Sequence, residues 1–237
     1  MKDSSNQRPD RGFWHRLSHR SFRKRKITTK NLKRLCAEHK TEEKTLVVHS
    51  EDVDYRPYFP NAYTVTKRQS VPADLHVDLY YRALSNIESE SYSVILCTGL
   101  LEHIPDPQRL IDELRRILRP GGKLIISASG VFSIHEGPND FYHFTPFSFK
   151  LLFAQWDRIE VLRGSCGPFE TIAILIQRTL MQCQISPPVR LLVEPLVGLL
   201  PMLDSFVAVQ YDTAGRRTPE HRIDSMLPSN IQAVVVK

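Results

Sequence analysis

Three side chains that can accept a proton follow two apolar segments of this sequence. Glu102 comes shortly after the apolar run at residues 92–98, and His135 and His143 follow the run at residues 123–128. Carboxylate and imidazole groups act as general bases when they lie within hydrogen-bond reach of a hydroxyl. If the two segments lie side by side in the fold, the loops that carry these three residues face the same ligand site.

The elements around these residues predict that arrangement. The run YSVILCT, residues 92–98, is typical of a central parallel strand that is buried on both faces. Pro107 then begins an amphipathic helix, which ends at Arg119 before a Pro-Gly-Gly stop and the next strand. Strand, helix and strand in this order form a right-handed crossover and a parallel sheet. Ligands of such sheets bind beyond the carboxyl ends of the strands, so we expect the loops at 97–103 and 127–142 to face one crevice.

Shorter patterns complete an α/β arrangement. Apolar runs and turn residues predict further strands at 45–49, 62–66, 75–79, 159–163 and 231–237, and helices at 31–39 and 146–156. Four prolines interrupt the apolar region 169–209, which predicts two or three short helices that form a lid or an oligomer surface, and 211–229 is a polar loop. We therefore predict a Rossmann-like, doubly wound, mostly parallel sheet in a three-layer sandwich with extra C-terminal helices.

Length and charge divide the chain into an arm and one domain. A chain of 237 residues that is 41% hydrophobic has room for one full α/β domain, here residues 31–237 with a helical insertion at 169–209.

The net charge of +6 comes from residues 1–40, which hold 13 Lys or Arg against 3 Asp or Glu. Residues 1–30 are therefore predicted to be a basic, flexible arm. Residues 11–30 suit an anionic membrane surface or nucleic acid, while a solvated tail is the simpler interpretation.

Several classes of site and of location are disfavoured by the sequence. The four cysteines stand far apart without a Cys-x-x-Cys pair, which is typical of neither a structural zinc site nor a dense disulfide framework. There is no secretory h-region and no apolar run of eighteen residues, so a cytoplasmic location is expected, with peripheral attachment to a membrane as the alternative. The histidines are too scattered in sequence to predict a metal site; they are His15, His19, His39, His49, His76, His103, His135, His143 and His221.

One long stretch resembles a known enzyme family. Residues 92–128, YSVILCTGLLEHIPDPQRLIDELRRILRPGGKLIISA, resemble the second half of class I S-adenosylmethionine-dependent methyltransferases of the type 11 kind. The stretch HEGPNDFYHFTPFSFKLLF, residues 135–153, resembles the His-x-x-Pro-x-Asp-Tyr-x-Arg-Phe-Thr pattern of a branch that is common among sugar and cell-surface biosynthesis enzymes. The resemblance implies a small-molecule or saccharide-type acceptor, with His135, His143 or Glu102 as its proton acceptor. A structural alternative is that Glu102 caps a helix and His103 braces the loop.

The same resemblance exposes changes at the cofactor positions. In the family a strand ends in an acid and continues into Gly-x-Gly-x-Gly, and an ungapped count places Val47 at the acid. His49, Glu51 and Val53 take the places of the glycines, which turn with positive φ and let the cofactor approach. The acid that holds the ribose hydroxyls is replaced by Lys67, at a cost of about two charge-assisted hydrogen bonds worth roughly 1.5 to 3 kcal/mol each. The other implied cofactor contacts are Asp78, near the adenine, and Cys97.

Two functions remain open on this reasoning. The first is methyl transfer from S-adenosylmethionine to a small or saccharide-type acceptor. The second is a catalytically inactive methyltransferase-like pseudoenzyme, a binding or scaffolding module whose cofactor site has decayed. An altered site that binds a different ligand is a third, weaker possibility. The prediction includes no metal and allows a homo-oligomer.

Overall fold

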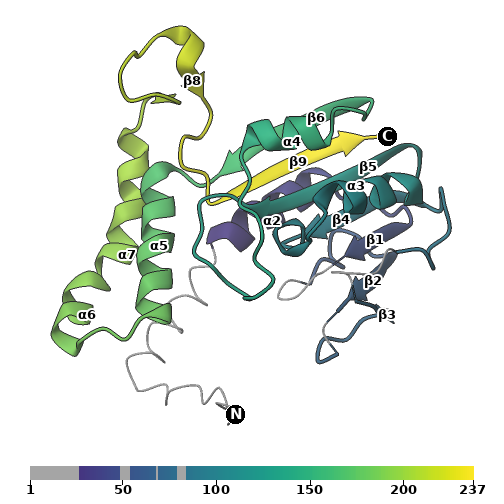
Figure 1. Cartoon of the computed structure of the whole chain (residues 1–237), viewed down its shortest axis with the longest axis horizontal. Coiled ribbons are helices and arrows are strands. Elements are labelled where there is room, and N and C mark those ends of the chain that lie inside the picture. Colours follow the sequence, from purple (N-terminus) through teal and green to yellow (C-terminus); the bar gives the residue numbers. More distant parts are fainter. Residues whose placement is uncertain (1–26, 49–53, 68, 79–83) are drawn as a thin grey trace, which may run out of the picture.

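The fold is built on one seven-stranded sheet. The structure is a computed structural model that describes residues 27–48, 54–67, 69–78 and 84–237 (Figure 1). The strand order is β3-β2-β1-β4-β5-β9-β6. Strands β1 to β5 are parallel to one another, and β9 is antiparallel to both β5 and β6. The strands are β1 (Thr45–Val48), β2 (Ala62–Thr66), β3 (Leu75–His76), β4 (Tyr92–Thr98), β5 (Leu118–Ser129), β6 (Arg158–Ser165) and β9 (Asn230–Val236).

Helices cover both faces of this sheet, which confirms the predicted doubly wound, three-layer fold. α2 (Ile27–Glu38) packs on one face, and α3 (Pro107–Ile117) and α4 (Pro146–Leu152) pack on the other (Figure 1). Alternate residues of β4 point to opposite faces, so Leu96 joins the core under α2 while Ile95 joins the core under α3. All seven residues of β4 are buried, as expected of a central strand.

The helix after β4 begins where the sequence predicts but ends two residues earlier. Asp106 accepts a hydrogen bond from the backbone N–H of Arg109 and Pro107 takes the first helical position, so the start is capped. The last residue of α3 is Ile117, and β5 begins at once with Leu118, which pairs with Tyr92. The Pro-Gly-Gly segment is then a bulge within β5, because the register shifts before the pairing with β4 resumes.

Two other predicted helices differ in length from the structure. α2 begins at Ile27 rather than at residue 31, so the last four residues assigned to the arm belong to a helix. Residues 1–26 lie outside the described part of the chain. α4 ends at Leu152 rather than at residue 156, because the chain turns there to bring Phe153 and Trp156 into the core.

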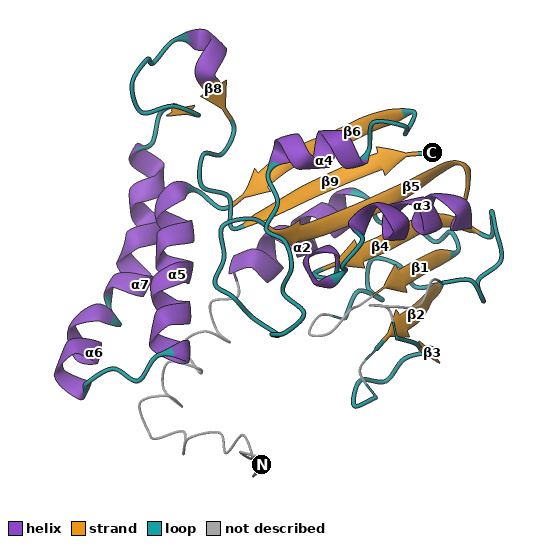
Figure 2. Cartoon of the chain, viewed as in Figure 1, coloured by secondary structure: helices purple, strands orange, loops and turns teal. Residues whose placement is uncertain are grey.

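The region after β6 is more helical than predicted. Its first helix, α5 (Pro168–Gln182), has fifteen residues, and α6 (Pro187–Val193), α7 (Leu196–Leu199) and the 3-10 helix η2 (Leu200–Phe206) follow. α5 lies beside α7 and η2, and this group stands at one end of the sheet (Figure 2). The prolines interrupt the region as expected, but they separate α6 and α7 and leave α5 continuous.

The segment between this group and β9 contains a small ribbon. Residues 211–229 were predicted to be a polar loop, whereas β7 (Gln210–Tyr211) pairs antiparallel with β8 (Arg222–Ile223), preceded by the 3-10 turn η3 (Pro219–His221). None of the helices in the described part of the chain is both long and apolar enough to cross a membrane.

Candidate active site

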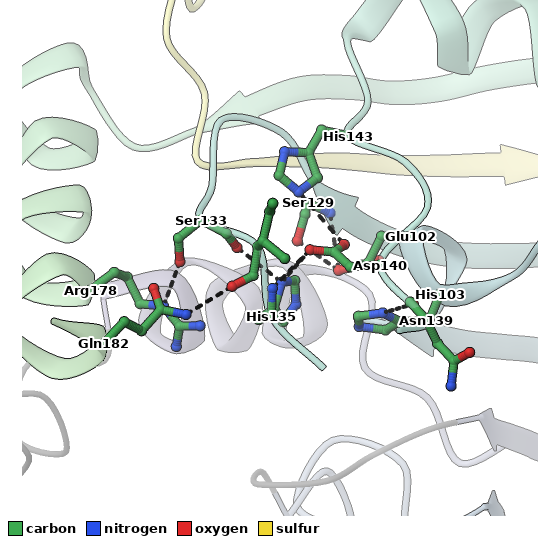
Figure 3. A network of polar contacts seen from close by, with 11 residues as sticks. Glu102, His103, Ser129, Ser133, His135, Asn139, Asp140, His143, Arg178 and Gln182 are labelled. Atoms are coloured by element: carbon green, nitrogen blue, oxygen red, sulfur yellow. Dashed lines mark hydrogen bonds and ion pairs between the residues drawn. The ribbon is translucent and has the colours of Figure 1, made fainter. Parts of the chain in front are cut away.

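The predicted acid–base residues meet where β4 and β5 end. Glu102 lies in the 3-10 turn η1 (Leu101–His103) after β4, and His135 and His143 lie in the long loop after β5 (Figure 3). β4 and β5 are adjacent and parallel, so their carboxyl ends reach the same edge of the sheet. The two loops therefore face each other, as the strand pattern predicts.

Glu102 joins three segments at this edge. Its side chain is 2% exposed, and Oε1 accepts from the Ser129 hydroxyl at 2.7 Å and from the Ser129 backbone N–H at 3.2 Å. Its carbonyl accepts from the N–H groups of Phe141 and Tyr142. The structure contradicts the alternative in which Glu102 caps a helix, because its carboxylate accepts hydrogen bonds from Ser129 at the end of β5. The other oxygen, Oε2, is buried and has no hydrogen-bond partner among the described residues.

His103 braces the loop, as the structural alternative proposes. Its ring is buried, and Nδ1 lies 2.7 Å from the carbonyl oxygen of Asn139. A carbonyl can only accept, so Nδ1 carries the proton in this contact. The ring also meets the ring of His135 edge-on, with 4.8 Å between their centroids.

His135 is held by its own loop. Its backbone N–H donates to Asp140 Oδ2 at 2.8 Å, and its ring nitrogen Nδ1 lies 3.2 Å from the carbonyl of Ser133 and 3.3 Å from Asp140 Oδ2. Burial lowers the pKa of His135, while the nearby Asp140 carboxylate acts in the opposite direction. The ring is therefore held in position and favours its neutral form.

Asp140 lies between the two histidines. Its side chain is 3% exposed, and Oδ1 is 3.6 Å from His143 Nε2, whose side chain is 33% exposed. Asp140 was not among the predicted site residues, although it occupies the aspartate of the His-x-x-Pro-x-Asp pattern. That pattern was the available signal, since the sequence alone does not show that the loop folds back between His135 and His143.

The insertion helix α5 supports the same loop. Arg178 donates to the Ser133 hydroxyl at 2.9 Å and its guanidinium lies 4.8 Å from the centre of the Phe132 ring. Gln182 donates to the carbonyl of Ile134 at 2.8 Å. Burial lowers the pKa of Arg178. No local sequence pattern predicts these contacts, because they join residues more than forty positions apart.

Of the positions predicted to contact the cofactor, some lie outside the described residues and others are described. His49, Glu51 and Val53 lie outside the described residues, so their substitution for glycine remains a prediction. Lys67, at the end of β2, forms an ion pair with Glu136 at 3.0 Å. A carboxylate from the loop after β5 therefore lies beside the ammonium group of Lys67.

The remaining predicted contacts lie on either side of this crevice. Asp78 is exposed just after β3. Cys97 differs from the prediction, because its side chain is wholly buried in the core between the sheet and α3 and burial raises the pKa of its thiol. Val47 is likewise buried, on the face under α2. Glu136 and Asp78 are carboxylates whose acceptor chemistry fits the ribose hydroxyls and the exocyclic amine of S-adenosylmethionine.

Comparison with known proteins agrees with this fold. Residues 36–126 match the family described as "Methyltransferase domain". A ubiquinone biosynthesis O-methyltransferase from Xanthomonas oryzae is 31% identical over 71 residues, which is 29% of this chain and 30% of that protein. One from Coxiella burnetii is 45% identical over 40 residues, 17% of each chain. The matched segments thus span less than a third of these relatives.

Solved structures agree over a longer span. A chain from the Haloferax volcanii complex of the Trm112 methyltransferase activator with a methyltransferase has a TM-score of 0.53 at 10% identity, and the match covers 94% of this chain and 97% of that one. An S-adenosylmethionine-dependent methyltransferase from Archaeoglobus fulgidus has a TM-score of 0.52 at 11% identity, over 90% and 94%. At such identities the likeness concerns the fold. Residues 36–126 thus resemble a methyltransferase domain, and the described chain has the same fold as these two methyltransferase structures.

Proposed function

We propose that the chain transfers a methyl group from S-adenosylmethionine to a hydroxyl of a small or saccharide-type acceptor. The observation that supports this proposal is the convergence of Glu102, His135 and His143 at the carboxyl ends of β4 and β5, next to the Lys67–Glu136 pair. An oxygen acceptor is favoured because the curated relatives are named O-methyltransferases. The saccharide-type alternative rests on the resemblance of residues 135–153.

The proposed reaction is a direct displacement. The acceptor oxygen attacks the methyl carbon as the bond from that carbon to sulfur breaks, and S-adenosylhomocysteine leaves. The proton of the acceptor hydroxyl passes to a side chain in the crevice. His135 is the best placed of the three predicted residues, since its ring is fixed by Ser133 and Asp140, while His143 lies nearer to solvent and Glu102 is deeper.

The proposed cofactor site uses residues from several strand ends. S-adenosylmethionine supplies an activated methyl group when bound. Glu136 would accept from the ribose hydroxyls, and Asp78 would accept from the exocyclic amine of adenine. Lys67 would orient the Glu136 carboxylate through the 3.0 Å ion pair. The loss of the acid from β2 is thereby offset by an acid from another loop.

Cofactor binding tests this proposal against the inactive alternative. The comparisons give no support to a pseudoenzyme, and the two functions differ in one measurable property. Calorimetry with S-adenosylmethionine and S-adenosylhomocysteine should show saturable binding of both. Absence of binding at millimolar ligand would refute the proposed function and leave the scaffolding module. Contact of the arm at residues 11–30 with anionic surfaces, a homo-oligomer and a cytoplasmic location remain predictions.

A further inference from the structure

We propose that His135, Asp140 and His143 bind a divalent transition-metal cation, such as Zn²⁺, Co²⁺ or Mn²⁺, with an open position for an oxygen ligand. The scatter of the histidines in sequence argued against a metal, but the loop after β5 brings two of them to one carboxylate (Figure 3). The proposed use of the cation rests on the proposed function, since it would bind the acceptor oxygen. Binding of the cation itself does not depend on methyl transfer.

The distances between the three side chains suit a metal centre. Bonds of about 2.0 to 2.1 Å in a tetrahedral site place neighbouring ligand atoms about 3.3 Å apart. His135 Nδ1 lies 3.3 Å from Asp140 Oδ2, and His143 Nε2 lies 3.6 Å from Asp140 Oδ1. One ligand atom from each of the three residues lies within 4.8 Å of the others. His135 Nδ1 also lies 3.2 Å from the carbonyl oxygen of Ser133, so binding of the cation requires this nitrogen to lose its proton and to turn away from that carbonyl.

A second observation is the state of the Asp140 carboxylate. The side chain is only 3% exposed, and Oδ1 has no hydrogen-bond partner among the described residues. An unsatisfied buried carboxylate oxygen is costly, and a cation would satisfy it. Oδ2 is already oriented by the backbone N–H of His135 at 2.8 Å, which is the kind of supporting hydrogen bond that metal-binding carboxylates have.

The surroundings leave room for exchange and for a substrate. His143 is one-third exposed, so the cation can enter from solvent. Three protein ligands leave at least one coordination position open, as in catalytic rather than structural sites. Two imidazole nitrogens favour Zn²⁺ or Co²⁺, and the carboxylate also suits Mn²⁺, whereas Mg²⁺ and Ca²⁺ prefer sites made of oxygen ligands.

Glu102 extends the same cluster. It forms, with His103 and His135, a second group whose ligand atoms lie within 4.8 Å of one another, and its buried Oε2 has no hydrogen-bond partner among the described residues. In the metal-loaded site His135 and His143 are ligands. With the cation bound, Glu102 would therefore accept the acceptor proton, in the role that His135 has in the metal-free chain under the proposed function.

Metal titration of the full-length, tag-free chain after chelator treatment tests this proposal. Calorimetry should show one equivalent of Zn²⁺ bound, and Co²⁺ should give the visible absorption of a site with nitrogen and oxygen ligands. Asp140→Asn and His143→Gln should each weaken Zn²⁺ affinity by more than about tenfold. His221→Gln is the matched control, because His221 also pairs with an aspartate, Asp212, at 3.0 Å but lies in the C-terminal ribbon.

The outcomes separate this proposal from the proposed function. Absence of Zn²⁺ binding, or affinity unchanged in both Asp140→Asn and His143→Gln, would overturn the metal site while leaving S-adenosylhomocysteine binding as measured. Should Asp140→Asn not fold, as judged by circular dichroism, the more exposed His143→Gln variant decides the question. Metal binding without any cofactor binding would support the site and refute methyl transfer.

Discussion

At the scale of single residues, the ion pair between Lys67 and Glu136 is the most informative contact. The sequence comparison predicts that Lys67 replaces the family's acid, and that this change alone removes two hydrogen bonds to the ribose. The structure places the Glu136 carboxylate 3.0 Å away, 69 residues later in the chain. A change that looks like loss in the sequence is thus consistent with relocation of the acid.

Glu136→Gln should weaken S-adenosylhomocysteine binding by about 10- to 100-fold, because a charge-assisted hydrogen bond worth roughly 1.5 to 3 kcal/mol becomes a neutral one. Calorimetry measures the change. Glu160→Gln is the control, since Glu160 in β6 also pairs with a lysine, Lys123 in β5, at 2.8 Å. Equal affinity of the wild type and Glu136→Gln would show that Glu136 does not bind the ribose.

The four cysteines should differ sharply in reactivity. Burial raises the pKa of Cys36 and of Cys166 to about 12 and also raises that of Cys97, whereas Cys183 is exposed. Thiolate is the reactive form, so at pH 8 a disulfide reagent should modify one thiol rapidly in the native chain and four after denaturation. Cys183→Ser should abolish the rapid phase. A rapid phase that persists in this variant would contradict the packing described.

At the scale of elements, the insertion helices support the loop that carries the site. α5 contributes Arg178 and Gln182 to residues 132–134, so the insertion acts on the crevice from a distance along the chain. The start of α5 is fixed in turn by η2. Asp204 accepts from the N–H groups of Phe169 and Glu170 at 2.9 and 2.8 Å.

Asp204→Ala should lower the free energy of unfolding by about 1 to 2 kcal/mol, because two N–H groups in the first turn of α5 lose their acceptor. Urea denaturation measures the difference. Asp224→Ala, at an exposed position in the C-terminal ribbon, should change the free energy by less than about 0.5 kcal/mol. The interpretation fails if the two variants are equally stable.

At the scale of the whole molecule, a histidine with a lowered pKa, His39, lies away from the candidate site. His39 follows α2 at the opposite edge of the sheet, beside Lys123, Glu160, Glu38 and Arg163. Burial is the main cause that lowers the pKa of His39, and the two cations act in the same direction. The folded chain thus binds a proton at His39 less readily than the unfolded chain does.

The stability of the chain should therefore decrease as the pH falls from 7 to 5. A group with a lowered pKa in the folded state contributes stability that is present above its unfolded pKa, near 6.5, and lost as the pH falls through the folded value. Urea denaturation across this range measures the slope. His39→Asn should reduce the slope, whereas an unchanged slope would mean that His39 does not contribute to it.

Much of the fold could be predicted from local pattern. The apolar run of β4, the capped start of α3 and the alternation along the strands depend on neighbours within a few residues, and these elements lie where the sequence predicts them. The sequence also placed Glu102, His135 and His143 on loops that meet, because parallel strands end at the same edge. The prediction of only short helices in residues 169–209 was wrong, because α5 has fifteen residues. Prolines indicate where a helix cannot continue, but not how far a helix extends before them.

The sequence by itself determined the family fold, the edge of the sheet that carries the site and the residue types available there. Only the tertiary structure decided which of them meet: Glu136 with Lys67, Arg178 with Ser133, and Asp140 between His135 and His143. The physical reason is that periodicity reports local backbone geometry, whereas these contacts depend on the path of a loop between distant elements. That path is set by packing against α5 and the ends of the strands, which no short stretch of sequence encodes.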